Sequence, residues 1–309
     1  MNPLLPEGAD PPGVTVVIPA FRSEATIGRC LAGLESQSFR DFETIVIDSS
    51  PDALTRQVVM AGFPWVQLCR SPPQMLPHAA RNAGFASARG RVLVSLDPDC
   101  VPVAEWLAHL VAPLGEGQAV VGGAIECAQR DWFSRGVHMS KFSWLLAGAP
   151  AGPRPFLATA NQAWLRAEWE AFRPFSVPLW AADTELDWRL RRDGTELYFE
   201  PRAVVFHIHQ ATPVSFWRER RSRGEDFAQM RAEFARWSLS RAALHLMGMS
   251  IEPLVILART LRSAARAGRL AEAVIASPIC LLGDIAWALG EAQALVSLLR
   301  GSAVGPDHV

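Results

Sequence analysis

Two acidic side chains of this sequence are spaced so that they could bind a metal ion. Asp97 and Asp99 are separated by Pro98 and follow the apolar run 92–96, which is rich in β-branched residues. Such a run is typical of a strand buried on both faces, and a proline ends it with a turn. Two carboxylates at the carboxyl edge of a parallel sheet suit Mg²⁺ or Mn²⁺, which in turn suit a bound diphosphate. The alternative is that the two aspartates only end a strand.

A third acidic side chain, Asp183, has the position of a general base. Asp183, Leu186 and Leu190 follow one another at i, i+3 and i+7, so we expect one buried helix face with the carboxylate in the first turn. The helix dipole would keep that carboxylate ionised, as a general base requires. Gly194 would end the helix. The alternative is an ordinary N-cap aspartate.

The elements that would position these carboxylates alternate between strand and helix. Residues 23–37 and 104–114 have helical apolar patterns, while other runs have the composition of strands. This alternation predicts a doubly wound α/β sheet of right-handed βαβ units. The expected strands are residues 14–18, 43–47, 65–68, 92–96 and 119–127.

The block from Arg81 to Asp99 resembles the central block of the family 2 glycosyltransferases, which are inverting, nucleotide-sugar-dependent enzymes of the GT-A fold. Three other blocks match in the same order. Residues 16–21 resemble the opening strand and loop, and 198–209 resemble the Pro-X-Ala-X-Val-X-His strand. The block at Asp183 resembles the Glu-Asp motif, although Ala182 stands in place of the glutamate.

The resemblance implies a GT-A fold, with a doubly wound, mostly parallel sheet, a Rossmann-like nucleotide-binding core and a helical C-terminal extension. It also implies roles for particular residues. Asp183 would be the catalytic base. The metal ligands would be Asp97, Asp99 and, as in some relatives, His207. The nucleotide-sugar would lie against Pro19, Ala20, Phe21, Glu24, Asp48, Arg81 and Asp97.

The implied reaction is transfer of a sugar from a nucleotide diphosphate-sugar, most simply a UDP-sugar, to an acceptor hydroxyl with inversion. Mn²⁺ or Mg²⁺ would neutralise the leaving diphosphate. The acceptor would be a glycan or a lipid-linked molecule of surface glycan or glycolipid synthesis. One alternative is a nucleotidyltransferase on a related fold, although no glycine-rich phosphate loop follows the first strand. The other is an inactive relative that binds nucleotide or glycan.

Composition excludes some classes of function. The chain has 309 residues and a formal net charge of −1, which argues against a general nucleic-acid binder. Its five cysteines show no metal-ligand spacing and indicate buried thiols in a reducing compartment. The N-terminus lacks the pattern of a signal peptide, so we expect a cytoplasmic protein.

The C-terminal third predicts contact with a membrane surface. Arg259, Arg262, Arg266 and Arg269 form one basic stripe, and neighbouring leucines form an apolar side, as in an interfacial helix on anionic lipid. The apolar run 273–283 is too short for a span. We therefore expect a peripheral or monotopic protein at the inner face of the cell membrane. The alternative is that these helices pack on the catalytic domain or on a second subunit, as in a homodimer.

The expected domain organisation has three parts. A disordered tail would occupy residues 1–12. A catalytic domain would occupy 13–212, with a nucleotide-sugar half at 13–100 and an acceptor half at 101–212. A helical region, 213–309, would follow. The arginines near residue 220 alternate with acids, which favours a solvated helix face.

Overall fold

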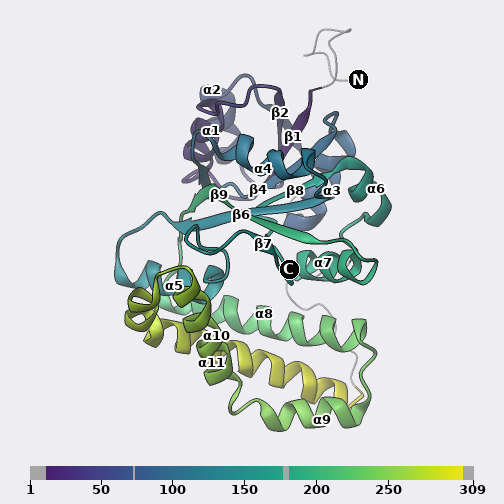
Figure 1. Cartoon of the computed structure of the whole chain (residues 1–309), viewed down its shortest axis with the longest axis vertical. Coiled ribbons are helices and arrows are strands. Elements are labelled where there is room, and N and C mark those ends of the chain that lie inside the picture. The colour runs from purple at the N-terminus through teal and green to yellow at the C-terminus, as the bar shows by residue number, and fades with distance from the viewer. Residues whose placement is uncertain (1–11, 72–73, 177–180, 302–309) are drawn as a thin grey trace.

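A computed structural model describes residues 12–71, 74–176 and 181–301. One mixed sheet runs through the N-terminal two thirds of the chain, and helices cover it (Figure 1). The predicted tail, residues 1–12, lies outside the described residues except for Pro12. The strands are β1 Val14–Ala20, β2 Phe42–Asp48, β3 Gln67–Arg70, β4 Val92–Leu96, β5 Cys100–Pro102, β6 Val120–Cys127, β7 Gly152–Pro153, β8 Asn161–Leu165 and β9 Leu197–His207.

The helices that connect the strands are α1 Ile27–Glu35, α2 Leu54–Gly62, α3 Pro77–Ser87, α4 Trp106–Gly115, α5 Trp132–Phe142, α6 Arg166–Phe172 and α7 Ala182–Arg192. After β9 the chain is helical, with α8 Pro213–Phe234, α9 Leu239–Gly248, α10 Glu252–Arg266 and α11 Leu270–Leu299. Figure 1 shows these four helices gathered on one side of the sheet, beyond α7.

The strand order is β3-β2-β1-β4-β8-β6-β9-β5, and β7 also pairs with β9. The strands β3, β2, β1 and β4 are parallel, because each returns through a helix. The apolar runs of β1, β2 and β4 are buried almost completely, as expected for a parallel sheet covered on both faces, whereas β3 at the edge is only partly buried. This confirms the predicted α/β fold class.

Several expectations about single elements were wrong. The third strand is Gln67–Arg70 rather than 65–68, and Trp65 is 40% exposed just before it. No element was expected at 132–142, because the apolar residues there have no clean period, yet these residues form α5, with Asp131 accepting from the backbone N–H of Ser134. β5 and β8 were not predicted, because β5 has only three residues and β8 joins the sheet antiparallel to β4 and β6.

α11 also differs from the expectation of a short apolar run. It is 30 residues long, and Pro278 lies inside it. It is the one described helix that is long and apolar enough to cross a membrane, and half of its apolar window is buried within the protein. α9 and α10 pass the same test only as a pair bent by 72°.

α11 packs closely on α8. A Cβ added at Gly224 of α8 would lie 2.2 Å from the carbonyl oxygen of Trp287, and one at Gly290 would lie 1.9 Å from that of Arg221. The backbones of the two helices therefore meet where both lack a side chain. The C-terminal helices meet the rest of the chain at α5, where a Cβ added at Gly136 would lie 2.5 Å from Cβ of Ile279 in α11.

Candidate active site

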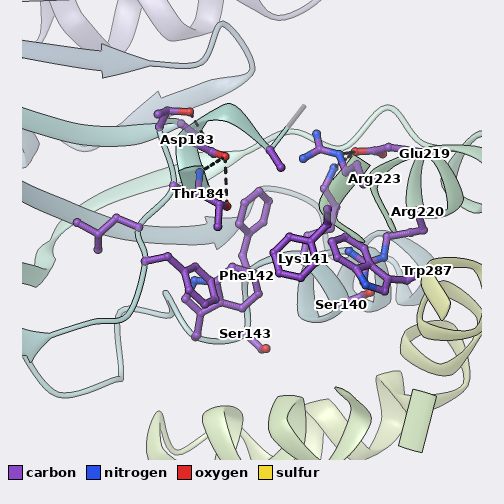
Figure 2. A pocket seen from close by; sticks show the side chains of 18 of the residues that line it. Ser140, Lys141, Phe142, Ser143, Asp183, Thr184, Glu219, Arg220, Arg223 and Trp287 are labelled. Carbon is purple, nitrogen blue, oxygen red and sulfur yellow. Dashed lines mark hydrogen bonds and ion pairs between the residues drawn. The ribbon is translucent and has the colours of Figure 1, made fainter. Parts of the chain in front are cut away.

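A pocket of about 950 Å³ lies between the carboxyl edge of the sheet and the C-terminal helices. The predicted site residues that line it are Arg81, Asp97, Asp99, Asp183 and His207. They come from α3, the turn after β4, α7 and β9, segments far apart in the sequence. Figure 2 shows Asp183 on one side of the pocket and α8 residues on another.

The Asp97 side of the pocket is held by Arg81. Arg81 is buried, donates from Nε to Oγ of Ser95 at 2.7 Å, and forms an ion pair with Asp97. The backbone N–H of Asp97 donates to the carbonyl of Ala160, which ties the turn after β4 to β8. The guanidinium is therefore fixed beside the carboxylate where a diphosphate was predicted.

Asp99 lies beside His207, because β5 pairs antiparallel with β9 and sets Cys100 opposite His207. Nε2 of His207 is 3.5 Å from Oδ2 of Asp99. Burial, and then the charge of Asp97, raises the pKa of Asp99 to about 7. Burial, and then Lys141, lowers the pKa of His207 to about 3, so this imidazole is neutral near pH 7.

These residues fit a divalent cation. Atoms of Asp99, Cys100 and His207 lie within 4.8 Å of one another. Asp99 is a carboxylate at a site where burial and Asp97 disfavour negative charge, and His207 offers a neutral ring nitrogen. Carboxylate and imidazole suit Mn²⁺. A bound cation would also offset the negative charge of the ionised Asp99 carboxylate. Buried Cys100 contributes a thiol that suits softer metals.

Asp183 lies at the second position of α7, after the N-cap Ala181, so it is not the predicted alternative of an N-cap residue. Oδ1 accepts from the backbone N–H of Thr184 at 2.8 Å, and Oδ2 accepts from Thr159 at 3.5 Å. Burial raises the pKa of Asp183, while the Thr184 N–H opposes that shift. A carboxylate with a raised pKa that faces a pocket is suited to accept a proton.

Asp187, one helical turn further on, was missed by the sequence analysis. It is buried, accepts from the Leu157 N–H at 2.7 Å and accepts from Gln162 at 3.2 Å. It therefore fixes the segment that carries Thr159 toward Asp183. Burial raises the pKa of Asp187 to about 8. The four-residue spacing from Asp183 was the available signal.

The α8 arginines form a solvated face only in part. Arg218 and Arg221 are exposed, whereas Arg220 and Arg223 line the pocket, so the prediction was wrong for these two. Arg220 is 7% exposed and pairs with Asp284 of α11 at 3.5 Å. Glu219 accepts from Lys141 at 2.7 Å and lies 3.0 Å from Arg223. Although burial raises the pKa of Glu219, Lys141 and Arg223 hold it well below its usual range. α8 was misread because its partners, α5 and α11, are distant in sequence.

The four arginines of the predicted basic stripe separate into two groups. Arg259, Arg262 and Arg266 line the pocket, whereas Arg269, just before α11, pairs with Glu126 and Glu272. The predicted continuous stripe therefore breaks at the end of α10. The sequence period was correct for one helix, but it could not show which surface that helix faces.

The remaining predicted nucleotide residues lie at the carboxyl ends of β1 and β2, outside the pocket lining. Ala20 is in register with Asp48, whose buried carboxylate accepts from the Ser50 N–H at 3.0 Å. Glu24 accepts from Thr55 at 3.2 Å, and Phe21 is 42% exposed. Pro19 completes this group within β1. Together they form a second cluster along the same edge of the sheet.

Comparison with known proteins gives a family match. Residues 15–168 match the family described as Glycosyl transferase family 2. Glycosyltransferase AglE of Haloferax volcanii is 30% identical over 121 residues, which are 37% of this chain and 40% of that protein. An undecaprenyl-phosphate 4-deoxy-4-formamido-L-arabinose transferase of Aeromonas hydrophila is 31% identical over 157 residues, covering 43% of this chain and 47% of that one. The chain thus spans less than half the length of these relatives.

Among solved structures, the mannosyltransferase PcManGT from Pyrobaculum calidifontis, in complex with GDP-Man and Mn²⁺, has a TM-score of 0.60 and 21% identity. The similarity covers 95% of this chain and 89% of that one, so it extends over the C-terminal helices. At this identity it establishes the fold alone. The chain therefore belongs to glycosyl transferase family 2 and has the GT-A fold.

Proposed function

We propose that the protein transfers a sugar from a nucleotide diphosphate-sugar to an acceptor hydroxyl, with inversion at the anomeric carbon. The observation that supports this most directly is the convergence of Asp97, Asp99 and Asp183 on one pocket. Inversion needs a leaving group on one face of the sugar and a base on the other. A diphosphate at Asp97 and Asp99, and an acceptor at Asp183, would satisfy that requirement.

In this proposal the donor nucleotide lies along the ends of β1 and β2. Asp48 and Glu24 offer acceptors to the nucleoside, and the exposed ring of Phe21 offers a surface for the base. Arg81 would lie beside the diphosphate, where a guanidinium can donate two parallel hydrogen bonds. The GDP-Man in the solved structure of PcManGT supports a nucleotide-sugar donor, and the nucleotide of this protein's donor would be UDP or GDP.

A divalent cation, Mn²⁺ or Mg²⁺, would be held by Asp99 and His207, with Asp97 nearby. When bound, it would neutralise charge on the departing diphosphate. The solved structure of PcManGT, which contains Mn²⁺, supports this assignment. Asp183 would remove the proton from the acceptor hydroxyl, with Thr184 and Thr159 holding its carboxylate toward the pocket.

We place the reaction at the cytoplasmic face of a membrane. The long apolar helix α11 supports this location, and so does the undecaprenyl phosphate in the name of the Aeromonas relative. Surface glycan or glycolipid synthesis is the corresponding role.

A donor screen tests the proposal. The full chain with Mn²⁺ is incubated with UDP- and GDP-sugars, and released nucleoside diphosphate is measured. We expect release from one donor, loss of release with EDTA, and product of inverted anomeric configuration by NMR once an acceptor is found. Absence of binding and release with every donor would refute the proposal.

A further inference from the structure

Three arginines of α10 face the pocket without an acidic partner. Arg259, Arg262 and Arg266 are spaced three and four apart, so they lie on one side of the helix, and all three line the pocket. Among the described residues, no hydrogen bond or ion pair involves their guanidinium groups. Their charges are therefore available to a ligand.

The other cations of the pocket are mostly neutralised by acids. Arg81 pairs with Asp97, Lys141 and Arg223 share Glu219, and Arg231 pairs with Glu291 at 3.0 Å. The exception is Arg154, which also lines the pocket. Its guanidinium donates to the carbonyls of Pro150 and Pro153 and lies 4.5 Å from the ring centroid of Phe199.

Arg154 and Arg266 are close enough to repel each other. Burial, and then the charge of Arg266, lowers the pKa of Arg154. Like charges gathered at a concave surface raise the local potential and disfavour the empty site. An anion between them would relieve that repulsion, and phosphate suits the paired donors of a guanidinium.

The same region of the pocket is lined by apolar groups. Trp144 packs edge-to-face on Phe156 with ring centroids 5.1 Å apart, and both line the pocket with Ile256 of α10. A ligand here would meet guanidinium groups beside apolar surface.

We propose that Arg259, Arg262 and Arg266, together with Arg154, bind a phosphate group of the acceptor, and that the acceptor is an amphiphilic phosphate. This inference rests on the proposed function, because it concerns the acceptor part of the same pocket. α10 lies outside the residues that match the family, 15–168, so this wall is supplied by the C-terminal extension.

The test uses octyl phosphate as the probe and octanol as its neutral counterpart. Binding to the full chain is measured by calorimetry and by tryptophan fluorescence, since Trp144 and Trp287 line the pocket. We expect octyl phosphate to bind at least tenfold more tightly than octanol. The triple variant Arg259→Gln/Arg262→Gln/Arg266→Gln should lose at least tenfold in affinity for octyl phosphate and little for octanol.

A charge-matched control is Arg29→Gln/Arg218→Gln/Arg300→Gln, three exposed residues outside the pocket lining. This control should bind octyl phosphate as the wild type does. If the triple variant does not fold by circular dichroism, the single variants Arg262→Gln and Arg154→Gln take its place. Equal affinity for octyl phosphate and octanol, or an equal loss in the control, would overturn the proposal.

Two further experiments distinguish an acceptor phosphate from a lipid headgroup, and a failure of the acceptor inference from a failure of the proposed function. If the triple variant keeps its affinity for octyl phosphate but loses binding to phosphatidylglycerol vesicles, the arginines contact lipid headgroups and the acceptor proposal is wrong. Donor affinity of the wild type with Mn²⁺ is measured separately. Its absence would refute the proposed function, whereas donor binding without octyl phosphate binding would refute only the acceptor inference.

Discussion

Nε2 of His207 lies 3.5 Å from Oδ2 of Asp99, although 108 positions of sequence separate the two residues. The contact arises because β5 follows directly after the Asp97–Asp99 turn and pairs antiparallel with the end of β9. The backbone N–H of Ile208 also donates to the carbonyl of Asp99 at 2.8 Å, which closes the turn onto β9. This strand pairing makes one candidate ligand set from two sequence blocks.

Asp99→Ala should abolish Mn²⁺-dependent donor binding, and His207→Ala should weaken it. Asp99 provides the carboxylate of the ligand set and His207 its neutral nitrogen. Calorimetry with a nucleotide-sugar, with and without Mn²⁺, measures the effect. His109→Ala, on α4 and outside the pocket, is the control. If donor affinity still depends on Mn²⁺ in Asp99→Ala, Asp99 is not a metal ligand.

Asp183→Asn should keep the fold and donor binding but slow transfer by about 10²–10⁴, the usual contribution of a positioned base. An amide oxygen can still accept from the Thr184 N–H, so the local structure should persist. Single-turnover rates with saturating donor measure the effect. Asp193→Asn, exposed at the end of the same helix, should leave the rate unchanged. Near-normal turnover in Asp183→Asn would leave Asp183 with a structural role only.

Asp187 should make folding stability depend on pH. Its folded pKa, about 8, is above the ordinary value of 3.8, so the folded state holds this proton more tightly than the unfolded state. The contribution of Asp187 to stability is then full below about pH 4. It falls by about 1.4 kcal/mol per pH unit as the pH rises toward 8.

Asp187→Asn cannot ionise and should therefore become more stable relative to the wild type as the pH rises from 5 to 8. Its amide can accept from Leu157 and donate to Oε1 of Gln162, which has no hydrogen-bond partner among the described residues. Urea unfolding at three pH values measures the difference, with Asp193→Asn as the control. A constant difference between Asp187→Asn and the wild type would show that Asp187 does not titrate in this range.

The sequence predicted the elements whose signal is local. The strands at Val14, Phe42 and Val92 are largely apolar and rich in β-branched residues, and α7 has a clear apolar face ended by Gly194 at φ 97°. The carboxylates next to these elements were therefore found. The order of the matching blocks also indicated that Asp97, Asp99 and Asp183 belong to one site, and all three line one pocket.

Features that depend on distant partners were not predicted. β5 is too short to have a pattern of its own and exists through its pairing with β9. The acids Asp284 and Glu291 interrupt the apolar sequence of α11, and they are buried against Arg220 and Arg231 of α8. Only the packing of α11 on α8 shows that these charges are matched.

Gly290→Val should destabilise the protein by about 1–3 kcal/mol or more, because overpacking at this position would push α8 and α11 apart. The added atoms would meet the carbonyl of Arg221, which cannot move without displacing α8. Thermal and urea unfolding measure the loss. Gly62→Ala is the control, since no atom lies near its added Cβ. An unchanged stability would mean that α11 does not dock on α8 in solution.

The last prediction concerns attachment to membranes through α9 and the start of α10. Leu244, Met247, Ile251 and Leu254 are each at least 60% exposed and lie around the 72° bend between these helices. Apolar side chains exposed in this way suit shallow insertion into a lipid surface. Since Arg259, Arg262 and Arg266 line the pocket instead, we expect the apolar part of the attachment to dominate.

The full chain should therefore sediment with phosphatidylglycerol vesicles, and high salt should release only part of it, because salt screens charges but not apolar insertion. Met247→Glu/Ile251→Glu should release most of the protein even at low salt. Val214→Glu, also exposed but at the start of α8, is the matched control and should stay bound. Point substitutions are preferable to truncation near residue 240, which would uncover the buried face of α8 against α11. If the wild type remains in the supernatant at low salt, these side chains must be covered by protein instead of lipid.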